Sequence, residues 1–220
     1  MDIIKQFFQD LGTMLSIPWF FVILELIGTL SGAVSGARLS AAKQFDLFGA
    51  FIVGTVTAVG GGTTRDLLIG KTPFWLEDPI YLLTCLFGLV WVILCRKWLV
   101  RQNNTWFIFD CIGFSLFNVI GIEKGLALGI PTWAAICLGI ITGAGGGVLR
   151  DILINEVPLI FRKEIYATCC LAGGIVYVVC LQYLGWHPEG AAVLSCAVAI
   201  AIRMLAVKYG WSLPTLKAEP

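Results

Sequence analysis

The sequence repeats itself at a fixed offset. Residues 54–73 read GTVTAVGGGTTRDLLIGKTP and residues 139–158 read GIITGAGGGVLRDILINEVP, an offset of 85 residues (139 − 54). The same offset, without gaps, also places Glu25 on Asp110. A shared GGGxxRD motif with ungapped flanks is not expected by chance, so the chain contains two copies of one unit.

The composition indicates that these units lie in a membrane. Hydrophobic residues make up 58% of the 220 residues, charged residues only 13%, and the mean hydropathy is +0.89. A soluble domain carries roughly 25% charged residues. The net charge of +1 gives no reason to expect a nucleic-acid partner. Each membrane-spanning helix needs about 20 mostly apolar residues. The apolar runs of this length predict spans at 19–37, 46–69, 80–99, 105–122, 132–154, 165–184 and 189–207.

The offset places spans one to three on spans four to six. An odd number of spans in each copy turns the second copy upside down, which predicts an inverted-topology repeat. Lys and Arg number ten in the loops of one side and three in those of the other. The richer side is expected to be cytoplasmic, so the N-terminus is outside and the C-terminus inside. The predicted units are an interfacial segment at 1–17 with a surface helix at 2–16, repeat one at 18–100, inverted repeat two at 104–185, an unmatched seventh span at 189–207 and a cytoplasmic tail at 208–220.

Each copy carries three consecutive glycines on its second span. They are Gly60, Gly61 and Gly62 in the first copy and Gly145, Gly146 and Gly147 in the second. A glycine costs about 1 kcal/mol relative to alanine inside a helix, so we expect both spans to kink or unwind there. Freed backbone must face protein or a water-filled path, which favours a permeation or binding site. The alternative is close helix packing by small residues.

Ionisable residues lie inside or beside the spans as repeat mates: Glu25 and Asp110, Arg65 and Arg150, Asp66 and Asp151. Such residues usually pair and line a functional path. Sequence neighbours on a helix do not face each other, so two pairings are open. Each arginine pairs either with the acid on the first span of its own copy, or with the motif aspartate of the other copy. The charges could also serve only to hold the bundle together.

Softer polar side chains lie near the glycines and could offer oxygens to an ion or a small zwitterion. They are Thr57, Thr142, Thr63, Thr64 and Asn118. No nucleophile, base or metal-ligand constellation is visible in the sequence, so we expect neither an enzyme nor a metal site.

Two inverted three-helix units, each with GGGxxRD on its second helix, plus a seventh helix, resemble the prokaryotic branch of the trimeric intracellular cation (TRIC) channels. Bacterial relatives of this type are also described as glycine transporters. The resemblance covers about residues 18–207. It implies an all-α homotrimer in the inner (plasma) membrane, with one pore per protomer for monovalent cations between kinked second and fifth spans. The glycine triplets would form the kinks, and the arginines and aspartates of both motifs would lie at or beside the pore. We expect no cofactor; a phospholipid and the permeant K⁺ or Na⁺ are the candidate ligands.

Two functions therefore stay open. The first is a K⁺ channel, favoured by a continuous polar path along the second and fifth spans and by the resemblance. The second is a carrier for glycine or another small amino acid, since discontinuous helices in an inverted repeat are typical of secondary transporters. A purely structural protein would leave the buried charges without a purpose.

Overall fold

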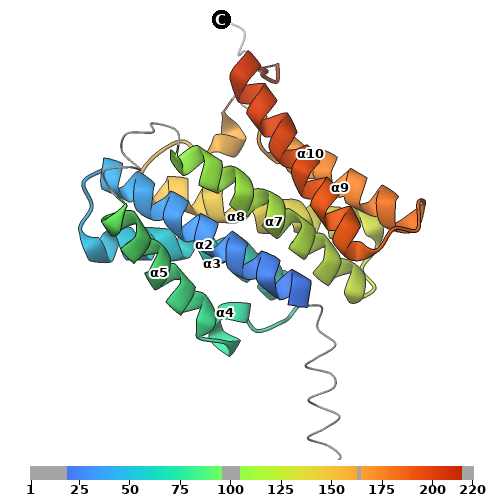
Figure 1. Ribbon diagram of the computed structural model, residues 1–220, viewed down its shortest axis with the longest axis horizontal. Coiled ribbons are helices and arrows are strands. Elements are labelled where there is room, and N and C mark those ends of the chain that lie inside the picture. Colours follow the sequence, from blue (N-terminus) through green and yellow to red (C-terminus); the bar gives the residue numbers. More distant parts are fainter. Residues whose placement is uncertain (1–18, 96–104, 163–164, 215–220) are drawn as a thin grey trace, which may run out of the picture.

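The computed structural model describes residues 19–95, 105–162 and 165–214 (Figure 1). The predicted surface helix at 2–16 lies outside these residues. The described elements are α2 (Trp19–Ala42), α3 (Leu47–Leu68), α4 (Phe74–Glu77), α5 (Ile80–Leu94), α7 (Thr105–Ala127), α8 (Thr132–Leu153), the 3₁₀ turn η1 (Leu159–Phe161), α9 (Ala167–Gln182) and α10 (Pro188–Tyr209). No β-strand occurs in the described parts of the chain, so the fold is all-helical as expected.

Five helices are long and apolar enough to cross a membrane: α2, α3, α7, α8 and α10. The other two predicted spans contain the shorter apolar helices α5, of 15 residues, and α9, of 16 residues. Helices of that length reach about 24 Å at 1.5 Å per residue, against a hydrocarbon core of about 30 Å. The chain is therefore a multi-pass membrane protein.

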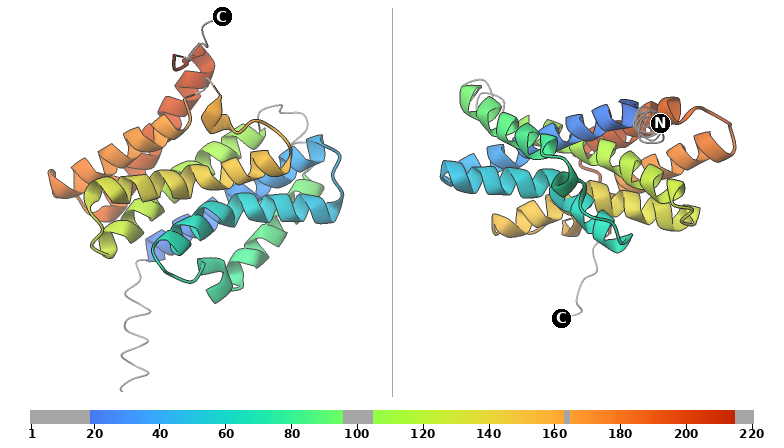
Figure 2. Two further views of the ribbon diagram at one scale, coloured as in Figure 1. Left: turned by 180° about the vertical axis from the view of Figure 1, so that it is seen from behind. Right: turned by 90° about the horizontal axis from the view of Figure 1, so that it is seen from below.

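The structure keeps the sequence repeat. The bounds of α8 are those of α3 shifted by 85 residues, and η1 follows α8 where α4 follows α3. Both long helices are followed by a residue with left-handed backbone, Gly70 (φ 68°) and its repeat mate Asn155 (φ 56°). Such a residue is a common way to end a helix. α2 and α7 run in opposite directions (Figure 1), as do α3 and α8 (Figure 2), so the second copy is inverted.

The centre of the molecule consists of α2, α3, α7 and α8, which pack against one another in pairs. α5 covers one side of this centre, against α2 and α3, whereas α9 and α10 cover the other side (Figure 1). α10 has no repeat mate and packs on α7 and α9. There its small residues Ala191, Ala192 and Cys196 join a buried cluster with Tyr177. The repeat is therefore symmetric in its first three helices and asymmetric in what covers them.

Candidate functional site

The two glycine triplets meet where α3 crosses α8. A Cβ atom on Gly61 would lie 2.1 Å from the carbonyl oxygen of Thr142, and one on Gly146 would lie 2.2 Å from that of Thr57. Gly61 and Gly146 are repeat mates, and so are Thr57 and Thr142. The two contacts are therefore related to each other by a two-fold axis through the crossing. Both helices continue through their triplets without interruption. The expected unwinding is therefore absent, because the missing side chains serve a close approach of two intact helices.

The threonines at this crossing also pack closely. Thr57 Oγ1 donates to the carbonyl of Val53, and Thr142 Oγ1 donates to that of Leu138, both at 2.6 Å. Each hydroxyl lies in the space left by a glycine of the neighbouring helix. Gly36 lies beside Thr57, and its repeat mate Gly121 lies beside Thr142. Thr57 and Thr142 thus lie at the centre of the four-helix core with their hydroxyl hydrogens already engaged.

At one end of the crossing lies the first charge cluster. Arg65 is fully buried, its Nε donates to Asp66 Oδ1 at 2.8 Å, and its terminal nitrogen lies 3.8 Å from Glu25 Oε1. The other oxygen of Asp66 accepts from the backbone N–H of Phe74 at 2.9 Å. The expectation that an arginine cannot pair with its sequence neighbour is therefore wrong. Asp66 stands in the last turn of α3 and turns toward the following loop, where the long arginine side chain reaches it.

Two further side chains hold Glu25. Lys124 of α7 lies 2.8 Å from Glu25 Oε1, and the hydroxyl of Tyr81 donates to Glu25 Oε2 at 3.0 Å. Sequence reasoning missed both partners. Tyr81 carried a signal, since its repeat mate is also a tyrosine, whereas the sequence identifies Lys124 only as a loop charge.

The second charge cluster lies at the opposite end of the crossing. Arg150, also fully buried, donates to Asp110 Oδ1, to Asp151 Oδ1 at 2.9 Å and to Ser35 Oγ at 3.2 Å. Asp151 Oδ2 accepts from the backbone N–H of Leu159 at 3.0 Å, as Asp66 does from Phe74. Of the two pairings left open, the structure has the one within each copy.

A cavity opens beside each cluster. The first vestibule, of about 360 Å³, lies next to Asp66, and the second vestibule, of about 220 Å³, lies next to Asp151. All residues lining the first vestibule except Thr72 have their repeat mates in the second. Four pairs of mates at the two rims differ in charge: a charged residue at one rim has either an oppositely charged residue or a leucine as its mate at the other. Mates at the two rims are Lys71 and Glu156, Glu77 and Arg162, Lys124 and Leu39, Leu128 and Lys43.

Between the vestibules, the four central helices leave a small cavity of about 10 Å³, lined among others by Thr57, Asp110, Gly113 and Tyr166. That is about the space of one water molecule. Asp110 Oδ2 is buried and has no hydrogen-bond partner among the described residues. The second cluster thus offers a carboxylate oxygen at the centre of the fold, and it holds one more carboxylate than guanidinium.

The remaining polar candidates lie away from this cavity. Thr63 and Thr64 donate to the carbonyls of their own helix, at 2.8 and 2.9 Å. Asn118 donates to the carbonyl of Cys170 at 2.9 Å and so links α7 to α9. Arg203 of α10 belongs by sequence to the loop charges, yet it is buried, donates to the carbonyl of Ile165 at 2.9 Å, and lies over two aromatic rings.

Comparisons with known proteins agree with this architecture. A family model described as "Glycine transporter" matches twice, at residues 22–97 and 107–182, two segments that are again 85 residues apart. The inner membrane protein YadS of Escherichia coli (strain K12) is 37% identical over 200 residues, which cover 89% of this chain and 96% of that protein.

Solved structures give the same result. The TRIC trimeric intracellular cation channel orthologue from Rhodobacter sphaeroides superimposes with a TM-score of 0.81 at 37% identity, covering 86% of this chain and 98% of the other. A structure described as the basis for conductance through TRIC cation channels superimposes with a TM-score of 0.79 at 34% identity, covering 91% and 98%. The chain therefore belongs to the prokaryotic TRIC family, the group of membrane proteins whose family model carries the description Glycine transporter.

Proposed function

We propose that the chain is a channel for monovalent cations, chiefly K⁺, with one pore in each protomer of a homotrimer. The observation that carries this proposal is the row formed by the first vestibule, the central cavity and the second vestibule along the crossing of α3 and α8. Buried carboxylates stand along this row, and the unpartnered Oδ2 of Asp110 is suited to a cation that has lost part of its hydration shell. Relatives described as cation channels support the same function.

In this proposal the structure corresponds to a closed state. A cavity of about 10 Å³ does not admit a hydrated ion. Conduction then requires α3 and α8 to separate or bend at their crossing, and the triplets of glycine are where bending is easiest. The predicted kinks thus belong to the conducting state. All seven apolar segments cross the membrane in this proposal, with the N-terminus outside and the second vestibule on the cytoplasmic side.

A carrier for glycine or a similar small amino acid is the second candidate. One observation favours it: the two vestibules are repeat mates separated by a closed centre, which is the arrangement that alternating access uses.

The deciding experiment is purified protein in planar bilayers under a K⁺ gradient, run beside labelled-glycine uptake into liposomes. Unitary currents that reverse near the K⁺ equilibrium potential support the channel. Saturable glycine uptake without currents refutes it and supports the carrier.

The pore position has its own test. A Cβ atom on Gly113 would make only ordinary contacts, at 3.5 Å and beyond, yet it stands at the wall of the central cavity. Gly113→Ala is therefore expected to lower unitary conductance without lowering thermal stability. The matched control is Gly190→Ala in α10, where the nearest atom is 3.8 Å away and no path is proposed. Equal conductance in both variants and the wild type would place the pore elsewhere.

A further inference from the structure

An ion pair between the two copies lies at the rim of the second vestibule. Lys43 belongs to the turn between α2 and α3 of the first copy, and Glu156 follows α8 of the second copy. The Lys43 ammonium donates to Glu156 Oε1 at 2.6 Å, and both residues line the vestibule. Their repeat mates at the first vestibule are Leu128 and Lys71. A leucine cannot pair with a lysine, so these positions join the two copies at one end only.

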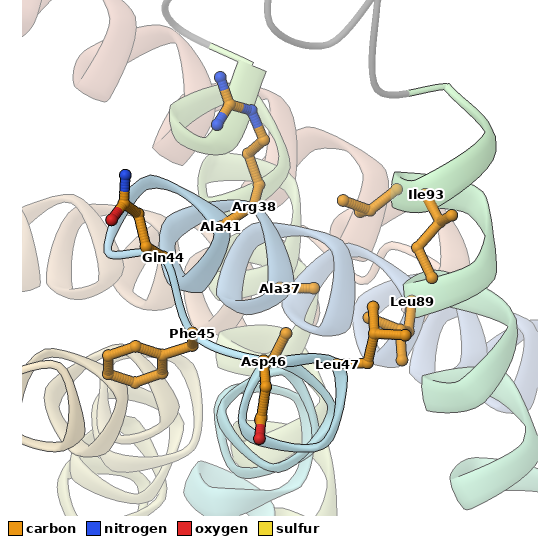
Figure 3. A pocket seen from close by; sticks show the side chains of 11 residues that line it. Ala37, Arg38, Ala41, Gln44, Phe45, Asp46, Leu47, Leu89 and Ile93 are labelled. Atoms are coloured by element: carbon orange, nitrogen blue, oxygen red, sulfur yellow. The ribbon is translucent and has the colours of Figure 1, made fainter.

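The turn that carries Lys43 is fixed to the start of α3. Figure 3 shows this turn, with Gln44 and Asp46 on it, as a short link from α2 into α3. Gln44 has left-handed backbone (φ 59°), and the backbone N–H of Lys43 donates to the carbonyl of Ser40 at 3.0 Å. The Asp46 carboxylate accepts from the backbone N–H of Gly49 at 2.6 Å and so caps α3. A displacement of the start of α3 therefore displaces Lys43 with it.

Glu156 is fixed in the same way to the second charge cluster. Its backbone N–H donates to the carbonyl of Asp151 at 2.8 Å, and Asn155 before it has left-handed backbone (φ 56°). The Asp151 side chain in turn accepts from Arg150 Nε at 2.9 Å. The Lys43–Glu156 pair thus joins the start of α3 to the end of α8. The two helices cannot separate at this end without breaking it.

We propose that the Lys43–Glu156 pair is a latch between the two copies, which keeps the second vestibule closed and makes opening sensitive to cytoplasmic salt. This inference rests on the proposed function, in which α3 and α8 separate to conduct cations. The two side chains are 42% and 40% exposed. An exposed pair is weak, so it biases the closed state without locking it. Salt screens such a pair, so a rise in cytoplasmic ionic strength favours release and opens the path for K⁺.

The charges around Glu156 make salt, and not mild acid, the releasing condition. The hydrogen bond from Lys43 holds the pKa of the Glu156 carboxyl below its ordinary value, and Arg162, at 3.2 Å, lowers it further. The other charged groups that line this vestibule are Asp151 and Arg150, which pair with each other. The carboxylate therefore stays charged at neutral pH. The latch is lost only when pH falls through the lowered folded-state pKa.

The test is the open probability of single channels, measured on the purified full chain in planar bilayers at low salt. Lys43→Gln and Glu156→Gln are each expected to raise it by up to about fivefold, the ratio that corresponds to a strong exposed pair. The double variant should gain no more than the larger single change, because both substitutions remove one contact. Choline chloride added on both sides should raise the open probability of the wild type and leave that of Lys43→Gln unchanged.

Arg162→Gln is the matched control. It removes the other partner of Glu156, which comes from the same copy, and keeps the latch. Its open probability is expected to stay at or below that of the wild type. An increase equal to that of Lys43→Gln overturns the proposal, because the charge of the rim would then matter and the link between the copies would not. Wild-type currents with an open probability that Lys43→Gln does not change overturn it as well.

Hydrogen-exchange mass spectrometry separates the latch from the channel. Loss of the latch is expected to speed backbone exchange in residues 39–46 of Lys43→Gln and Glu156→Gln, but not of Arg162→Gln. If exchange follows this order and no protein, the wild type included, carries current, the latch stands and the channel is refuted. Equal exchange in all four proteins overturns the latch, whatever the currents show.

Discussion

Gly61→Ala is the change that most directly tests how the two copies meet. The added methyl group would lie 2.1 Å from the carbonyl oxygen of Thr142, against the 3.4 Å at which ordinary contact begins. The obstacle is the backbone of α8, which cannot rotate away as a side chain does. Overpacking of this kind costs typically about 1–3 kcal/mol, and the higher helix propensity of alanine offsets about 1 kcal/mol. We expect a net destabilisation of up to about 2 kcal/mol.

The neighbouring glycine provides the matched control. A Cβ atom on Gly60 would approach only the Cδ1 atom of Leu149, at 2.7 Å, and the tip of that side chain can move. Gly60→Ala gains the same helix propensity at little packing cost, so it is expected to leave stability unchanged or to raise it. The two-fold relation adds a second check, because Gly146→Ala should cost about as much as Gly61→Ala.

The measurement is thermal unfolding of the three purified variants in the same detergent, followed by the fluorescence of native tryptophans. The order expected for the midpoint is Gly60→Ala at or above the wild type, and both Gly61→Ala and Gly146→Ala below it. If all three variants shift equally, the triplets act through backbone flexibility and not through contact, and the packing argument fails.

Three further predictions concern the charges. Asp110→Asn leaves the buried Arg150 with one charged partner fewer and is expected to cost about 3 kcal/mol, the lower end for a broken buried pair, in the same unfolding assay. Glu25→Gln should cost less, since the nearest guanidinium nitrogen is 3.8 Å away; an equal or larger loss would contradict this order. The exposed Lys43–Glu156 pair (2.6 Å) should contribute a small stabilisation that disappears at high salt. The hydrogen bond from the Lys43 ammonium holds the pKa of the Glu156 carboxyl below its ordinary value. This contribution is therefore present above the unfolded-state pKa and lost as pH falls through the folded-state pKa. A double-mutant cycle of this pair against pH that shows coupling growing toward acid would contradict the sign.

The repeat is the part of the fold that the sequence predicts best. An ungapped offset assigns a mate to every residue, so once one copy is understood the other follows, and the inverted topology comes from the odd number of helices. The pairing of Arg65 with Glu25 is one of two alternatives, because the repeat does not predict whether an arginine takes its acidic partner from its own copy or from the other. The structure decides it because α3 and α8 run in opposite directions (Figure 2), so their motif charges lie at opposite ends of the crossing and each arginine meets the acid of its own copy.

What could not be predicted depends on contacts between the copies and on residues without mates. Lys124 of α7 and Glu25 of α2 are 99 residues apart in the sequence, and no pattern in either helix predicts that these two residues meet. The glycine triplets allowed both a kink and a close packing, since both need the same residue. The alternatives are distinguished by what lies opposite the glycines. Here the backbone of Thr142 lies against Gly61, so the triplet serves close packing.

The departures from symmetry determine how the two ends differ. Perfect two-fold symmetry would make the vestibules equal in size and charge, and in the proposed channel either end would then serve a permeating cation equally well. Instead Lys124 places an ammonium on Glu25, whereas its mate Leu39 leaves the corresponding carboxylate, Asp110, without one. The first vestibule is the larger one, but Glu25 in the cluster beside it is already paired with the Lys124 ammonium. The second vestibule is smaller, and Asp110 in the cluster beside it keeps one oxygen without a hydrogen-bond partner among the described residues. In the proposed channel, a cation is therefore expected to be held more strongly at the Asp110 end, and this difference lies in the positions where the two copies depart from each other.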